Sequence, residues 1–348
     1  MPAVFTYNHP FALECGKTLP DFHLAYTTYG QLNETHDNVV WVFHALTANS
    51  DPAEWWYGLV GDNCLVNPRE HFIICVNMPG SCYGSIGPLD EDKQIGAPFY
   101  HNFPWFTTRD MIHAYQHLKN HLGISKIHIG IGGSMGGQQL LEWAIEEPQL
   151  FQNIIPIATN AQHSPWGIAF NATQRFCIEQ DETWSEKNEN AGIEGMKTAR
   201  AIALLSYRNY HTYSTAQHGP TAATKEASID AQIFNAETYQ RYQGEKLAKR
   251  FNAFSYYFLS KGMDAHDVGR GRGSASKALQ QIKAHTLVIS IQSDILFPVE
   301  EGRFLAAHIP DAIFQLIDSP YGHDGFLLEF DQITNAIRNF LKSTAFKV

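Results

Sequence analysis

The sequence predicts an α/β protein built on a mostly parallel sheet with helices on both faces. Short apolar, β-branched runs alternate with helical patterns along the chain, which is typical of parallel sheets. Runs such as Phe72–Val76 are apolar at every position, as expected for strands that are covered on both faces. The chain has 348 residues, 44% of them hydrophobic, enough for one large domain or two modest ones.

Six strands are expected, and each is a short apolar run. In chain order they are Val39–His44, Phe72–Val76, Ile127–Ile131, Ile154–Ile157, Thr286–Ile291 and Ile313–Ile317. A helix is predicted over Gln139–Ile145, before Pro148. A second helix is predicted over Asp331–Leu341, where the apolar residues recur at helical spacing and can cover one face of the sheet.

The pattern changes between the fourth and fifth strands. From about residue 161 to residue 285 the chain is aromatic and polar by turns and shows no clear strand. We therefore expect a helical lid inserted over residues 161–285, above the carboxyl edge of a core formed by residues 1–160 and 286–348.

Charge and cysteine usage exclude several classes of function. The formal net charge is −10, which disfavours binding to nucleic acid or to an anionic membrane surface. The five cysteines form no Cys-x-x-Cys pair, so neither a disulfide framework nor a zinc knuckle is expected. The N-terminus lacks the features of a signal peptide, and no apolar run approaches the ~18 residues of a membrane span. We expect a cytoplasmic protein.

The strongest motif is Gly132–Gly137, which satisfies G-x-S-x-G around Ser134. A predicted strand precedes it and a predicted helix follows, as a nucleophile elbow requires. No Lys-Ser/Thr follows the glycines, so a phosphate-binding loop of the Walker type is excluded. Ser134 is the candidate nucleophile.

A serine nucleophile needs a base and an acid that orients the base, in the chain order Ser, Asp, His for this type of elbow. Asp294 follows the fifth strand and His323 follows the sixth. The simpler alternatives are a helix-capping role for Asp294 and a surface position for His323. The backbone N–H groups of Met135 and Leu46 are the expected oxyanion hole, since Leu46 follows the first strand.

One possible metal site is set aside. His113, His117 and His121 recur on one face of a predicted helix, but no carboxylate or cysteine joins them in register. We predict a solvent-facing histidine stripe and no metal centre.

Taken together, the motifs resemble those of the homoserine O-acetyltransferases, a family with the α/β-hydrolase fold. The similar segments are His44–Thr47, Asn77–Pro88, Gly132–Gly137, Ala169–Glu179, Ala199–Arg208, Asn252–Asp264, Ser293–Pro298 and Gly322–Leu327. They cover nearly the whole chain.

The resemblance implies a two-step transfer of an acetyl group from acetyl-CoA to the γ-hydroxyl of L-homoserine, in methionine biosynthesis and without a further cofactor. It assigns Arg200 and Tyr207 to the substrate carboxylate, Asp324 to the substrate ammonium, and Thr47 to the same pocket. It also implies a homodimer formed through the lid helices.

Some loops depart from the family pattern and keep other reactions open. The departures lie at Ala48–Asp51, at Pro79–Ser81 and at Ile86. Succinyl-CoA in place of acetyl-CoA, and serine in place of homoserine, are therefore alternatives. So is a serine esterase or thioesterase with the same triad, or a catalytically inactive interaction module.

Overall fold

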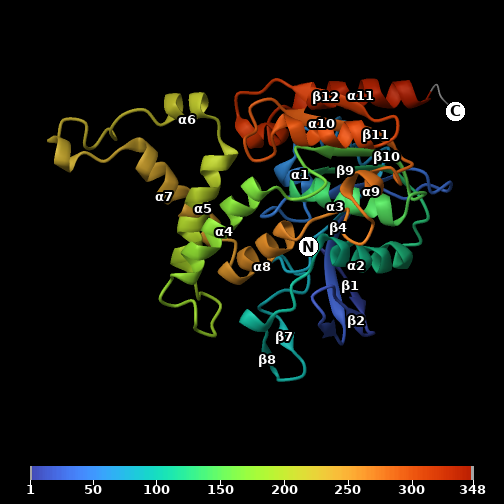
Figure 1. Cartoon of the computed structure of the whole chain (residues 1–348), viewed down its shortest axis with the longest axis horizontal. Helices are drawn as coiled ribbons and strands as arrows, with labels where there is room; N and C mark the ends of the chain where they lie inside the picture. Colours follow the sequence, from blue (N-terminus) through green and yellow to red (C-terminus); the bar gives the residue numbers. More distant parts are fainter. Residues whose placement is uncertain (1, 346–348) are drawn as a thin grey trace.

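The chain forms a twisted eight-stranded sheet with helices on both faces (Figure 1). A computed structural model describes residues 2–345. The strand order is β1-β4-β6-β5-β9-β10-β11-β12. Strand β4 pairs antiparallel with both β1 and β6, and the six strands from β6 to β12 in this order are parallel to one another. The bounds are β1 (Ala3–Tyr7), β4 (Phe22–Tyr29), β5 (Val39–Phe43), β6 (Phe72–Val76), β9 (Ile127–Gly133), β10 (Phe151–Ile157), β11 (His285–Ile291) and β12 (Ile313–Ile317). The predicted fold class is confirmed.

The six predicted strands are the six parallel strands. Only their ends differ: β5 stops one residue before His44, while β9 runs on to Gly133. The prediction did not include strands β1 and β4. It also did not include two small antiparallel pairs, which are β2 (Phe11–Ala12) with β3 (Thr18–Leu19) and β7 (Glu91–Asp92) with β8 (Ala97–Pro98). Polar residues interrupt these segments: β1 alternates between exposed and buried positions near its centre, β4 carries three half-buried positions, and β7 and β8 have no buried residue.

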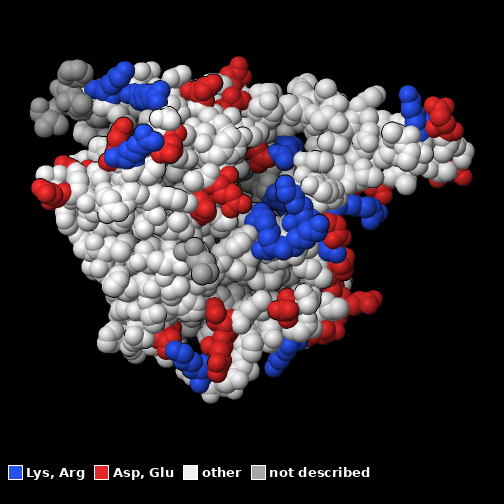
Figure 2. All heavy atoms as spheres, turned by 180° about the vertical axis from the view of Figure 1, so that it is seen from behind, with Lys and Arg blue, Asp and Glu red and all other residues white. Residues whose placement is uncertain are grey.

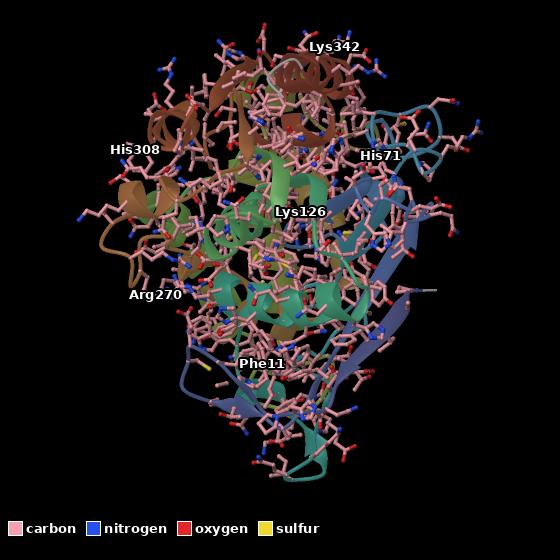
Figure 3. The ribbon with its side chains drawn as sticks, turned by 90° about the vertical axis from the view of Figure 1, so that its right-hand side faces the viewer. Phe11, His71, Lys126, Arg270, His308 and Lys342 are labelled. Carbon is pink, nitrogen blue, oxygen red and sulfur yellow. The ribbon has the colours of Figure 1, made fainter. Side chains whose placement is uncertain are left out.

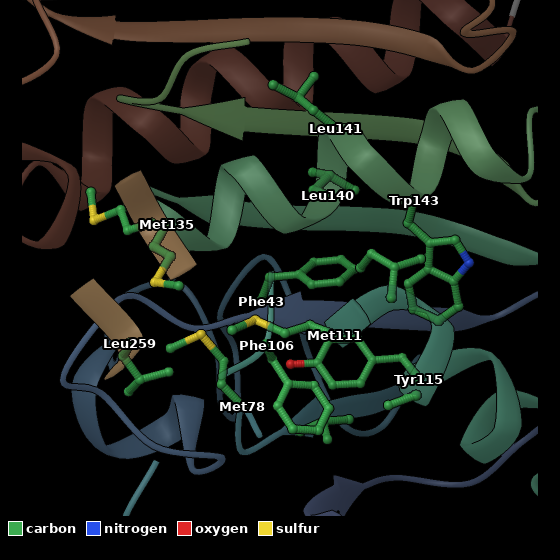
Figure 4. Packing of buried hydrophobic residues seen from close by; sticks show 14 of the residues in the cluster. Phe43, Met78, Phe106, Met111, Tyr115, Met135, Leu140, Leu141, Trp143 and Leu259 are labelled. Atoms are coloured by element: carbon green, nitrogen blue, oxygen red, sulfur yellow. The ribbon is translucent and has the colours of Figure 1, made fainter. Parts of the chain in front are cut away.

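Alternate residues of the central strands supply two cores. Trp41 and Phe43 of β5 point into one core, while Val40 and Val42 point into the other. The first core is closed by α2 (Thr108–His121), α3 (Met135–Glu146) and α10 (Val299–His308), and the second by α11 (Phe330–Ala345). Figure 4 shows Phe43, Tyr115 and Trp143 packed in the first core, with ring centroids 6.0 to 6.4 Å apart.

The two predicted helices are present with longer bounds. The one predicted from Gln139 begins already at Met135, directly after the elbow serine. The C-terminal helix spans Phe330–Ala345, and its residues Ile333, Ile337 and Phe340 are buried against the sheet as expected. No helix within residues 2–345 is both long and apolar enough to cross a membrane.

The stretch between β10 and β11 is helical. It contains α4 (Pro165–Glu179), α5 (Ile193–Tyr207), α6 (Tyr210–Ala216), η2 (Ile229–Ala231), α7 (Asn235–Ala248), α8 (Ala253–Asp264) and α9 (Ala275–Leu279). Figure 1 shows α6 and α7 projecting away from the sheet, whereas α8 and α9 lie against the core. We propose that residues 161–285 act as the lid of a core made of residues 1–160 and 286–348, of which residue 1 and residues 346–348 lie outside the described residues.

The histidine stripe on α2 is only partly solvent-facing. His117 stacks on Tyr7 of β1 at 3.9 Å between ring centroids, and the ring of His121 lies 5.0 Å from that of Phe5. Figure 3 shows Phe11 of β2 beside the same helix. The positions of His117 and His121 are therefore explained by packing against the N-terminal strands, whereas Nε2 of His113 lies 3.7 Å from Oε2 of Glu146 on α3.

Candidate active site

Ser134 sits on a strained turn between β9 and α3. Its φ is 57° and its ψ is −127°, a region that non-glycine residues rarely adopt. A Cβ on Gly132 would lie 2.6 Å from the backbone of Gly136, and a Cβ on Gly136 would lie 2.1 Å from the carbonyl oxygen of Phe43. Both positions therefore require glycine, and the geometry is that of a nucleophile elbow.

Asp294 and His323 form a buried pair. His323 lies on η3 (Gly322–Leu327), and its Nδ1 is 2.6 Å from Oδ2 of Asp294. The other carboxylate oxygen of Asp294 accepts hydrogen bonds from the backbone N–H groups of Leu296 and Phe297, at 2.8 and 2.9 Å. One carboxylate oxygen of Asp294 thus fixes the backbone of its own loop, while the other orients the imidazole of His323. The side chain of His323 is 5% exposed, so it is not a surface histidine.

Aromatic rings fix the plane of the imidazole. Phe297 stacks on His323 at 5.2 Å between centroids, Phe326 lies at 5.1 Å and Tyr207 at 5.8 Å. Together with the bond to Asp294, these contacts leave the ring little freedom to rotate. Its Nε2 is then the nitrogen available for proton transfer.

The sequence-predicted residues gather around one cavity of about 350 Å³. Its walls come from the loop after β5, from the elbow, from α5 and from η3. Of the nine predicted site residues, those that line it are Leu46, Thr47, Ser134, Arg200, Tyr207, His323 and Asp324. Asp294 lies behind His323, and the side chain of Met135 is buried in the core. Met135 is the first residue of α3, so its N–H is one of the unpaired donors at that helix N-terminus.

His44 holds the loop that carries Leu46. Its Nε2 accepts a hydrogen bond from the N–H of Met78 at 3.0 Å, so the proton lies on Nδ1, which donates to the carbonyl of Ala45 at 2.9 Å. Complete burial lowers the pKa of His44 to about 4 and keeps it neutral. In a trans peptide the C=O and the next N–H point in opposite directions. The N–H of Leu46 therefore points away from His44, and sequence reasoning had given His44 no role.

Arg200 and Tyr207 share one face of α5. They are seven residues apart, which is about two helical turns, and the guanidinium carbon of Arg200 lies 5.4 Å from the ring centroid of Tyr207. Burial raises the pKa of Tyr207, so its hydroxyl stays protonated. An arginine fork and a neutral hydroxyl are groups suited to bind a carboxylate.

Asp324 is already paired. Its carboxylate forms an ion pair with Arg208, the residue that follows α5. The histidine loop can approach the end of α5 because Gly322 has no side chain: a Cβ there would lie 2.8 Å from the backbone of Arg208. An ammonium group that binds Asp324 must therefore share it with Arg208, and the sequence analysis had not identified Arg208.

The mouth of the cavity carries further residues that the sequence analysis had not assigned. Trp55 and Glu54 come from α1 (Pro52–Trp55), while Lys246 and Arg250 come from the end of α7 and the turn after it. Nη1 of Arg250 donates to the carbonyl of Thr47 at 2.6 Å and to the hydroxyl of Tyr83. No sequence pattern links α7 to the loop after β5.

Metal-ligating side chains do not cluster in the described part of the chain. No group of three or more His, Cys, Asp or Glu residues within it could hold a metal ion.

Comparison with known proteins agrees with this geometry. Residues 38–330 match the family model of the α/β hydrolase fold. A homoserine O-acetyltransferase from Cyclobacterium marinum is 47% identical over 337 residues, which are 97% of this chain and 94% of that protein.

Two solved structures show the same fold. Homoserine O-acetyltransferase from Bacillus anthracis aligns with a TM-score of 0.90 at 22% identity, over 98% of this chain and 97% of that one. Esterase E22 aligns with a TM-score of 0.88 at 23% identity, over 98% and 99%. The fold is thus shared by transferases and hydrolases. The sequence identity of 47% over 97% of this chain is to a homoserine O-acetyltransferase, and the chain belongs to that family.

Proposed function

We propose that this protein transfers an acetyl group from acetyl-CoA to the γ-hydroxyl of L-homoserine, a step of methionine biosynthesis. The observation that carries the proposal is the cavity in which Ser134 and His323 meet Arg200 and Tyr207 of the helical insertion. Of these four residues, an esterase needs only Ser134 and His323. Arg200 and Tyr207 are suited to bind the carboxylate of an amino acid. The relative at 47% identity is named homoserine O-acetyltransferase.

In the first half-reaction Ser134 attacks the thioester carbonyl while Nε2 of His323 takes the proton of the hydroxyl. Asp294 holds the tautomer and stabilises the imidazolium that forms. The negative charge on the carbonyl oxygen is stabilised by the N–H groups of Leu46 and Met135. The thiol of CoA leaves with the proton from His323, and an acetyl-serine remains.

In the second half-reaction homoserine replaces CoA. His323 removes the proton of the γ-hydroxyl, the oxygen attacks the acetyl-serine, and Ser134 regains its proton when O-acetyl-homoserine departs. Arg200 and Tyr207 bind the carboxylate, Thr47 lines the pocket, and Asp324, shared with Arg208, attracts the ammonium. Acetyl-CoA is a substrate of this scheme, which uses no further cofactor.

The insertion also supports a homodimer. Large apolar side chains of the insertion that are half exposed or more include Trp166, Phe176, Leu205, Tyr210, Ile229 and Tyr242. Large apolar side chains exposed on the surface are suited to a protein interface. We propose that the helices of two copies cover one another there. Since both proposed substrates are metabolites of the cell interior, a cytoplasmic location follows from the proposal.

The test is release of CoA from acetyl-CoA and from succinyl-CoA, with and without L-homoserine or L-serine, with product masses read in parallel. We expect release that depends on homoserine and a product with the mass of acetyl-homoserine. Release without an acceptor, with free acetate as product, would indicate a hydrolase. The Ser134→Ala variant should form no acyl-enzyme; a mass increase of that variant would place the nucleophile elsewhere.

A further inference from the structure

Two cations at the mouth of the cavity have no part in the scheme above. Lys246 and Arg250 line the same cavity as Ser134, and both are exposed. The side-chain ammonium of Lys246 has no ion-pair or hydrogen-bond partner among residues 2–345. In Figure 2, Lys and Arg side chains gather beside a hollow, on a chain whose formal net charge is −10. Cations concentrated at the mouth of a site on an acidic protein indicate an anionic ligand.

The guanidinium of Arg250 is held in place. Hydrogen bonds from its Nη1 to the carbonyl of Thr47 and to the hydroxyl of Tyr83 fix the guanidinium beside the loop after β5. Its Nη2 has no hydrogen-bond partner in the described part of the chain. The acidic residue on the same mouth, Glu54, accepts a hydrogen bond from Nδ2 of Asn49 at 3.2 Å. Asp324 is paired with Arg208. The two cations are therefore not neutralised by these carboxylates.

The size of the cavity excludes a complete acyl-CoA. About 350 Å³ accommodates an amino acid with a thioester end, at the lower limit of ligand pockets. The pantetheine arm must then leave through the mouth, and the diphosphate and phosphomonoester groups must lie outside. Homoserine carries a single anionic group, for which Arg200 is already available: it lines the same cavity and is half-buried, whereas Lys246 and Arg250 are exposed.

We propose that Lys246 and Arg250 bind the phosphate groups of the acyl-CoA donor and set the preference for CoA over shorter thioesters. This inference rests on the proposed function. Lysine contacts phosphate as a point charge, and arginine adds directed N–H donors. Because both groups are exposed and screened by salt, each is expected to change affinity by about a factor of two to five.

The experiment compares two donors in the full-length protein. Acetyl-CoA carries the phosphates, whereas S-acetyl-N-acetylcysteamine has the same thioester without them. Lys246→Ala is the cleaner variant, since Arg250 also supports Thr47. Lys249→Ala is the matched control, because Lys249 caps the same helix, is exposed, and does not line the cavity.

We expect Lys246→Ala to raise the KM for acetyl-CoA about five-fold, with kcat and the KM for the truncated donor unchanged. Lys246→Arg should restore most of the affinity, and Lys249→Ala should change neither donor. An equal effect on both donors, a higher KM for homoserine instead, or no effect would overturn the assignment.

A binding measurement separates failure of this inference from failure of the proposed function. Adenosine 3′,5′-diphosphate carries a phosphomonoester and part of the diphosphate, and its affinity is measured by calorimetry without turnover. Weaker binding to Lys246→Ala than to the unmodified protein supports the phosphate site even where no acetyl-homoserine forms. Equal binding to both would refute it even where the enzyme is fully active.

Discussion

The two hydrogen bonds of His44 can be separated by two substitutions. The amide of asparagine can place an N–H where Nδ1 of histidine lies, and the amide of glutamine can place an oxygen where Nε2 lies. His44→Asn therefore keeps the donor to the carbonyl of Ala45 and loses the acceptor for the N–H of Met78. His44→Gln keeps the acceptor for Met78 and loses the donor to Ala45.

The structure predicts opposite outcomes. In His44→Asn the N–H of Met78 is left buried without an acceptor, which costs about 1–3 kcal/mol of folding free energy. In His44→Gln the peptide between Ala45 and Leu46 loses the bond that orients it. Removing an oxyanion donor lowers kcat by about 10²–10³, so a misdirected donor should lower it about 10–100-fold. That is about 1.4–2.7 kcal/mol of transition-state stabilisation.

The assays are urea denaturation for stability and single-turnover acylation by acetyl-CoA for catalysis. We expect His44→Asn to unfold at lower urea with a nearly normal acylation rate, and His44→Gln to show the reverse. If His44→Gln acylated at the normal rate, the orientation of the Leu46 N–H would not depend on His44, and our account of the oxyanion hole would be refuted.

Three further predictions concern the triad, the substrate and pH. Asp294→Asn should lower kcat by about 10⁴ with little change in either KM, because the wrong tautomer of His323 is then favoured; a loss below tenfold in steady-state assays would contradict this. Arg200→Ala should raise the KM for homoserine at least tenfold and leave acylation unchanged, and an unaltered KM would remove Arg200 from the acceptor site. Burial lowers the pKa of His44 and of His266 to about 4, and that of His163 to about 3. In the unfolded chain these histidines are protonated at a higher pH than in the folded chain, so the free energy of unfolding should fall as pH drops from about 6.5 to 4. Urea unfolding at several pH values measures the number of protons taken up on unfolding, and His44→Asn should lower that number by about one. An unchanged number would show that His44 is not kept neutral.

Local patterns were sufficient for the parallel strands and the elbow. A strand covered on both faces is apolar at nearly every position, so the runs at β5 and β6 are recognisable without knowledge of their neighbours. Ser134 was recognisable because the strained turn needs glycine at fixed offsets on either side. The strand β4 was not predicted, because His23, Thr27 and Thr28 interrupt its apolar pattern although most of the strand is buried or half-buried.

The positions of Asp294 and His323 in the chain indicated a triad, because both follow the carboxyl ends of parallel strands, which meet at one edge of the sheet. Their contact at 2.6 Å depends on the crossing of two loops 29 residues apart, and no local pattern contains it. Arg200 was assigned through resemblance alone. A lone arginine on a helix is indistinguishable from a solvated charge until the helix is placed over the cavity.

The sequence by itself determined the fold class, the nucleophile and the family, since each depends on residue types at short, fixed spacing. Only the tertiary structure decided which groups meet across long separations: His44 with Met78, Arg208 with Asp324, and Arg250 with the loop at Thr47. These contacts join segments that are separated by different lengths of chain, and neither segment of a pair carries a sequence pattern that points to the other. Their energies depend on burial and direction, which exist only once the chain is folded.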